Sequence, residues 1–311
     1  MRFRTAPRRD EFPTCYSLPH SRPKVIHLGT QRSCAGHEEP SHLSANIGPY
    51  MREEPLSTFS DWEFMLDGNT QEFRQRASEA GSDYFNIYGG VDDWLDCPND
   101  DFRMTTLYCE NETDPDVAWQ VGYELISLFN GASILFRKEY RKASIYKLLH
   151  KGTPVNFAAN RGTTGLLGKP PISQDRIRRE YENGSRSSIK FSLMHLATEH
   201  RDAYFILKYL DMEASWTTYY KLMEAIETFA NEKNIELGTS KKTRRSFTNT
   251  ANNFSLSGFD SRHGFKELAK QNNTESMSIE EGHAFVSSMA KEYLQKAYFP
   301  KQRDSWRPGA L

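Results

Sequence analysis

The sequence predicts an α+β protein, in which a small strand-containing N-terminal part packs with a mainly helical C-terminal domain. Short apolar runs separated by Asp, Gly, Asn and Pro follow residue 59, and this pattern is typical of strands. Beyond about residue 186, apolar residues recur at spacings of three and four, which is the period of an amphipathic helix. At 311 residues the chain is long enough for two domains. We therefore expect an α+β domain at 59–185 and a helical domain at 186–300.

The two ends of the chain are predicted to lie outside these domains. Residues 1–58 are rich in Pro, Arg, Ser and His and show no apolar period, so we expect a disordered arm there and a short tail at 301–311. Cys34, His37 and His42 are residue types that bind zinc, but their spacing follows no common finger pattern. We expect neither a metal nor a cofactor.

The first domain is predicted to contain four strands and one long helix. The strands are WEFML at 62–66, YFNIY at 84–88, RMTTLYC at 103–109 and PVNFA at 154–158. Asp114 is placed as the N-cap of the helix, with Pro115 in its first position. The helix carries an apolar stripe made of Val117, Val121, Leu125, Leu128, Ala132 and Leu135.

The second domain is predicted to contain helices at 201–210, 215–232, 242–253 and 279–298. Ser278 and Glu281 form a capping-box pattern at the start of the last helix. Its inner face is expected to carry Phe285, Met289, Tyr293 and Ala297. The aromatic residues Trp216, Tyr219 and Tyr220 are interpreted as core residues.

Composition excludes several classes of protein. No apolar run approaches the roughly 20 residues that span a bilayer, and no signal-peptide core follows the basic N-terminus. The four cysteines include no CxxC pair, which argues against a disulfide framework and fits a reducing cytoplasm. The chain also lacks a dinucleotide fingerprint and a nucleophile elbow. We expect a cytoplasmic protein that does not bind membranes.

Charge is distributed unevenly along the chain. Residues 61–139 hold 17 Asp and Glu against 5 Lys and Arg, whereas 140–311 hold 18 against 27. This asymmetry has two interpretations, which are an anionic partner for the second half or attraction between the two halves.

The most basic stretch lies at 241–270, where seven Lys and Arg oppose two carboxylates. Cations of this density bind phosphates, and amide side chains add hydrogen bonds to bases or backbone. A solvated helix face is the alternative interpretation. The candidate nucleic-acid-binding residues are Lys241, Lys242, Arg244, Arg245, Asn249, Asn252, Asn253 and Lys266.

Arg262 and His263 lie within this stretch and are the candidate catalytic pair. His263 titrates near neutral pH and suits general acid–base catalysis, and Arg262 suits stabilisation of a phosphate charge. The structural alternative is a buried Arg-His pair bound to a carboxylate such as Glu224 or Glu227.

Four phrases resemble a set of uncharacterised bacterial proteins with a short α+β first part and a helical C-terminal part. They are LFNGA at 128–132, TTYYKLMEAIE at 217–227, TANNFSLSGFDSRHG at 250–264 and MSIEEGHAF at 277–285. The third phrase is similar to a Thr-Ala-Asn, Ser-Gly, Ala-Arg-His-Gly tract, with Ser261 in the place of Ala.

The helical part is also faintly similar to HEPN domains, many of which cleave RNA with an arginine and a histidine four to six residues further on. Counting from Arg262, those positions hold Glu267, Leu268 and Ala269, so the nuclease motif is not reproduced. We therefore expect a binding or regulatory module that contacts RNA through its basic half. The alternatives are a HEPN-like, metal-independent ribonuclease of a defence or toxin type and a protein-interaction module.

Overall fold

The computed structural model describes residues 60–78, 84–92, 97–137, 139–158, 188–265 and 275–299, together with positions 165, 167, 168, 175 and 178. All of them belong to one compact unit, Glu53–Leu311. The predicted arm, its zinc candidates, the predicted tail and the domain boundary near residue 185 lie outside the described residues. The division into two domains stays a prediction.

Within the described part of the chain, five strands form one antiparallel sheet in the order β2-β3-β1-β4-β5. The strands are β1 (Trp62–Asp67), β2 (Asn86–Asp92), β3 (Cys97–Thr105), β4 (Ser144–His150) and β5 (Thr153–Pro154). In the central strand β1, alternate side chains Trp62, Phe64 and Leu66 are buried. Phe64 lies opposite Met104 on β3 and Leu148 on β4. This alternation fixes the register, since a slip by one residue would expose every apolar side chain of the strand.

Two helices accompany the sheet, α1 (Thr70–Ser78) and α2 (Pro115–Phe136). The predicted start of α2 is confirmed, because the Asp114 side chain accepts a hydrogen bond from the Asp116 N–H at 2.9 Å and Pro115 stands in the first turn. Most of the predicted stripe is buried, namely Leu125, Leu128, Ala132 and Leu135. Val117, at the start of the stripe, is exposed.

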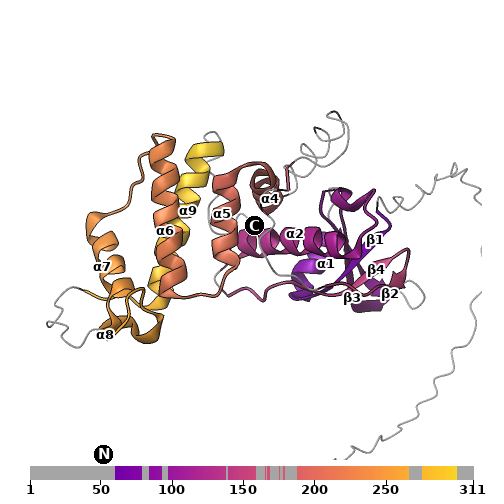
Figure 1. Ribbon diagram of the computed structural model, residues 1–311, viewed down its shortest axis with the longest axis horizontal. Helices are drawn as coiled ribbons and strands as arrows, with labels where there is room; N and C mark the ends of the chain where they lie inside the picture. Colours follow the sequence, from indigo (N-terminus) through magenta and orange to yellow (C-terminus); the bar gives the residue numbers. More distant parts are fainter. Residues whose placement is uncertain are drawn as a thin grey trace, which may run out of the picture. The chain divides into compact units, whose positions relative to one another are not determined.

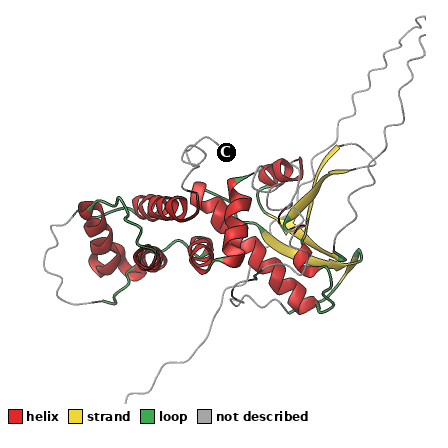
Figure 2. Cartoon of the chain, turned by 90° about the horizontal axis from the view of Figure 1, so that it is seen from above, coloured by secondary structure: helices red, strands yellow, loops and turns green. Residues whose placement is uncertain are grey.

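The remaining α-helices of the described chain follow the sheet in sequence. They are α4 (Ile189–Glu199), α5 (Arg201–Asp211), α6 (Trp216–Glu232), α7 (Lys241–Asn252), α8 (Phe254–Ser257) and α9 (Ile279–Tyr298). Figure 1 shows α5, α6 and α9 side by side, with α7 and α8 at the end of this group farthest from the sheet. Figure 2 shows the strands gathered in one region with helices beside them, and a second region made of helices alone, which fits an α+β fold.

The predicted features of this helical part are largely confirmed. Ser278 and Glu281 form the capping box of α9. On the predicted inner face of α9, Met289 and Tyr293 are buried, whereas Phe285 and Ala297 are partly buried. The three aromatic residues of α6 expected in the core are buried there, namely Trp216, Tyr219 and Tyr220.

Two glycines let α2 lie close to both parts of the fold. A Cβ at Gly122 would stand 2.4 Å from the ring of Phe64 on β1, and one at Gly131 would stand 2.1 Å from the carbonyl oxygen of Leu207 on α5. Nine residues separate the two glycines, so they face opposite sides of the helix. Helix α2 is therefore in close contact with the sheet on one side and with α5 on the other.

Two predicted strands are wrong, and some elements were not predicted. Leu107–Cys109 forms a 3-10 turn after β3 instead of extending the strand. The segment PVNFA is not a strand, since β5 ends at Pro154 and the ring of Phe157 stacks on Trp119 of α2 at 4.3 Å. The sheet uses β4 instead, which was not predicted, and α1 and α4 were not predicted either. Residues 190–198 of α4 are buried all round, so the helix lacks the polar face that an amphipathic pattern requires.

Candidate functional site

Helix α7 has one buried face and one basic face. Ser240 caps its first turn by accepting a hydrogen bond from the Thr243 N–H. The buried face carries Phe247, whose ring lies 5.6 Å from that of Trp216 and 4.9 Å from that of Phe285. The cations and amides of the helix recur at intervals of three and four residues from Lys241 to Asn252. This spacing places them on the opposite face. Packing of Phe247 therefore turns the cations and amides of the helix outwards.

This outward face borders a hollow of about 480 Å³. Its lining residues are Lys241, Arg244, Arg245, Thr248, Asn249, Asn252 and Asn253. We call this hollow the α7 groove. Six of the eight predicted nucleic-acid-binding residues meet there. Lys242 lies elsewhere, in an ion pair with Glu275 at 3.0 Å, and Lys266 lies outside the described residues.

The cations of the α7 groove differ in how far they are neutralised. Arg244 binds both carboxylate oxygens of Glu227, at 2.5 and 2.8 Å, and these hydrogen bonds raise the pKa of the guanidinium. No ion pair to Lys241 or Arg245 is found among the described residues, and both side chains are exposed. These two residues supply the positive charge that the groove offers to a ligand.

Polar groups without partners lie along the same face. The hydroxyl oxygen of Thr248 and the carbonyl oxygen of the Asn252 side chain are buried and accept no hydrogen bond from the part of the chain that the structure describes. The amide of Asn253 donates to the backbone carbonyl of Asn249 at 2.6 Å and to its side-chain oxygen at 2.9 Å. Buried polar groups in native proteins are nearly always paired. Within the described part of the chain, the buried oxygens of Thr248 and Asn252 remain unsatisfied.

Arg262 and His263 do not form the buried pair of the structural alternative, because both are exposed. The Arg262 guanidinium lies over the Tyr220 ring at 4.2 Å and 3.7 Å from the Glu224 carboxylate. Glu224 was one of the two predicted carboxylate partners. The described contacts of Arg262 run to α6 and, through its backbone N–H, to the Ala251 carbonyl of α7 at 2.8 Å. They hold the loop after α8 against these two helices, and the catalytic role of the pair stays a prediction.

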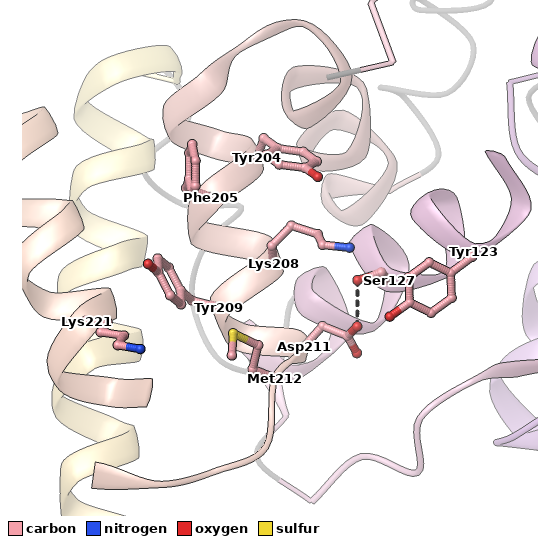
Figure 3. Close-up of a pocket in the computed structure, with 9 residues that line it drawn as sticks. All are labelled: Tyr123, Ser127, Tyr204, Phe205, Lys208, Tyr209, Asp211, Met212 and Lys221. Carbon is pink, nitrogen blue, oxygen red and sulfur yellow. Dashed lines mark hydrogen bonds between the residues drawn. The ribbon is translucent and has the colours of Figure 1, made fainter. Parts of the chain in front are cut away.

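A second hollow, which the sequence did not suggest, lies between α2 and α5 and has a volume of about 470 Å³ (Figure 3). Ser127 of α2 donates a hydrogen bond to Asp211 of α5 at 2.6 Å, and burial raises the pKa of Asp211. Behind the hollow, Glu124 accepts hydrogen bonds from Lys208 at 3.0 Å and from Tyr204 at 3.2 Å. An advance signal was the pair Glu124 and Ser127, two polar residues on the mainly apolar helix α2.

The polar groups of this second hollow form contacts between helices. Its buried carboxylates already bind partners within the chain, since Asp211 also lies 3.6 Å from the Lys142 ammonium. Paired groups of this kind join α2 to α5 and leave little polar capacity for a ligand. The α7 groove is the better candidate for a binding site, because Lys241 and Arg245 have no ion-pair partner among the described residues.

The described residues offer neither a metal-binding cluster nor a membrane-spanning helix. Among the described residues, no group of three or more His, Cys, Asp and Glu side chains is placed to hold a metal ion. None of the helices in the described ranges is long and apolar enough to cross a membrane. No family model matches the chain, and no curated protein or solved structure shows significant similarity to it.

Proposed function

We propose that this protein is an RNA-binding module and that the α7 groove is its binding surface. The observation that carries the proposal is that one helix face joins two unneutralised cations, Lys241 and Arg245, to a row of amide and hydroxyl groups. Cations attract the phosphates of a nucleic acid, and amides supply hydrogen bonds to its bases and sugars. The resemblance of the helical part to HEPN domains points to the same class of ligand.

Pairing within the chain also favours the α7 groove over other basic surfaces. Lys190 and Lys208 bind carboxylates of the acidic first half, Glu72 and Glu124. These cations are thereby neutralised inside the fold. Lys241 and Arg245 have no such partner among the described residues, so their charge is directed to solvent and to any polyanion there.

The proposal is tested by measuring the affinity of the purified full-length protein for a fluorescent single-stranded RNA over a series of salt concentrations. The double variant Lys241→Ala/Arg245→Ala removes two phosphate contacts. The slope of log K against log salt should then fall by about 1.4, and affinity at 0.1 M salt should fall by about tenfold or more. The matched control Lys147→Ala/Arg201→Ala removes two other exposed cations and should change neither quantity.

Two results would contradict the proposal. One is an absence of salt-dependent RNA binding by the unaltered protein, and the other is an equal loss of affinity in both double variants. The same samples are run on a denaturing gel with a chelator present. Chelator-resistant cleavage that disappears in His263→Ala would establish the ribonuclease alternative, and capture of an acidic protein with no RNA binding would establish the interaction module.

A further inference from the structure

The loop after α7 carries three phenylalanines that cluster at the surface. Phe259 is 97% exposed and Phe265 is 71% exposed, which makes them the most exposed large hydrophobic side chains in the described part of the chain. Each of the two rings meets the ring of Phe254 edge to face, with centroids 5.4 Å apart. We call these three side chains the phenyl cluster. Exposed aromatic side chains grouped in this way are uncommon on soluble proteins and mark interaction sites.

Hydrogen bonds fix the backbone that presents the phenyl cluster. The Ser257 hydroxyl donates to the carbonyls of Thr250 at 2.8 Å and Asn253 at 3.2 Å. Gly258 turns the chain with a positive φ of 59°, which residues with a side chain rarely adopt. Thr217 of α6 then donates to the Asp260 carbonyl at 3.3 Å. These hydrogen bonds attach the segment 257–260, which carries Phe259, to α6 and α7.

Along the chain, the phenyl cluster begins directly after the residues that line the α7 groove. Phe254 directly follows Asn253, which lines the groove, and α8 begins where α7 ends (Figure 1). The backbone N–H of Arg262 donates to the Ala251 carbonyl in the last turn of α7. A chain of phosphates lying in the groove would thus bring its next bases to the exposed rings.

We propose that the phenyl cluster stacks unpaired bases of a single-stranded RNA whose phosphates lie in the α7 groove. This inference rests on the proposed function and specifies its substrate class. Cationic grooves flanked by aromatic rings bind single strands because every base has a flat face that stacks on an aromatic ring. The bases of a duplex are already stacked on one another and offer no such face. Charge complementarity therefore selects the polyanion, and the rings select its single-stranded form.

The test compares three labelled ligands with the same number of nucleotides and therefore the same charge. They are a single-stranded RNA, the same backbone without bases, and an RNA hairpin whose two halves pair as a duplex. The double variant Phe259→Ala/Phe265→Ala should bind the single strand at least about tenfold more weakly with an unchanged salt slope. Its affinities for the duplex and for the abasic strand should not change. Phe259→Tyr should retain binding, because tyrosine keeps the stacking face.

Controls separate this inference from the proposed function. Tyr146→Ala removes another exposed aromatic side chain, 56% exposed on β4, and should leave all three affinities unchanged. Because Phe259 and Phe265 are exposed, their loss should leave the Tm within a few degrees of the unaltered protein. Full single-strand affinity in the phenylalanine variant would overturn the phenyl cluster as a stacking surface while leaving the α7 groove in place.

Two further outcomes would also overturn it. If the unaltered protein binds none of the ligands, the proposed function fails together with the inference. If the phenylalanine variant only converts a dimer into a monomer in sedimentation experiments, the phenyl cluster is a contact between two copies of this chain.

Discussion

His195 on α4 is a buried titratable residue. It is 8% exposed, and its ring meets Tyr84 edge to face with centroids 4.1 Å apart. Burial disfavours the imidazolium and lowers the pKa of His195 from 6.5 to about 4. The folded protein therefore keeps this side chain neutral at a pH where the unfolded chain already takes up a proton.

We predict that this histidine makes the protein sensitive to acid. Its contribution to the free energy of unfolding is complete above pH 6.5 and is lost as the pH falls from 6.5 towards 4. The shift corresponds to about 3 kcal/mol. His195→Leu should flatten this part of the pH profile in urea unfolding experiments, whereas removal of the exposed His263 should not. A profile that is equally steep in His195→Leu would contradict the assignment.

The sequence predicted the surroundings of some single residues better than those of others. The sequence placed the cations and amides of α7 in one candidate surface. Once the start of a helix is known, the residues that share one of its faces follow from their spacing. It also named Glu224 as a partner for Arg262. The contact of Arg262 with Tyr220 and the exposure of Phe259 could not be read in advance, since both depend on how the loop after α8 returns to α6 and α7.

At the scale of elements, α2 depends on close approach to its neighbours. The Gly131 position leaves no room for a side chain, because the carbonyl oxygen, carbonyl carbon and Cα of Leu207 would stand 2.1, 2.7 and 2.9 Å from its Cβ. All three atoms are backbone, so relief requires a shift of the whole of α5. Glycine at this position is thus a packing requirement of the crossing between the two helices.

Gly131→Ala should therefore destabilise the fold. Overpacking against backbone costs about 1–3 kcal/mol, which outweighs the roughly 1 kcal/mol that alanine gains over glycine in a helix. Gly264→Ala is the matched control, since no atom lies within 4 Å of its added Cβ. Both are measured as shifts in the urea midpoint. Stabilisation of the protein by Gly131→Ala would show that α5 moves away at little cost.

Elements with a clear local signal were predicted, and those defined by their surroundings were not. Helix α9 has a capping box and an apolar stripe, so its bounds of 279–298 agree with the prediction. Helix α4 is buried on every side, and β4 is recognised only through its pairing with β1. Conversely, Val155 and Phe157 follow an apolar pattern but pack against the core as a loop.

At the scale of the whole molecule, the uneven charge of the chain serves in part to hold the fold together. Glu72 on α1 and Lys190 on α4 are separated by 118 residues and form a buried ion pair, with side chains 2% and 3% exposed. Glu124 on α2 binds Lys208 on α5 in the same way. The attraction between acidic and basic halves is therefore real. It coexists with Lys241 and Arg245 of α7, which have no ion-pair partner in the described ranges, so the two interpretations of the charge asymmetry are compatible.

The Glu72–Lys190 pair supports the last prediction, because it joins the sheet-bearing part of the fold to the helical part. Burial lowers the pKa of Lys190, and the neighbouring Glu72 carboxylate opposes that shift.

Loss of one partner leaves an uncompensated buried charge, so Glu72→Met should lower the free energy of unfolding by about 3–5 kcal/mol. The double variant Glu72→Met/Lys190→Met leaves no charge unpaired and should recover much of that loss. Asp100→Ala breaks the exposed pair with Arg74 and should cost under about 1 kcal/mol. If the loss in the double variant equals the sum of the losses measured for Glu72→Met and for Lys190→Met alone, the two charges do not stabilise each other, and apolar packing alone joins the two parts.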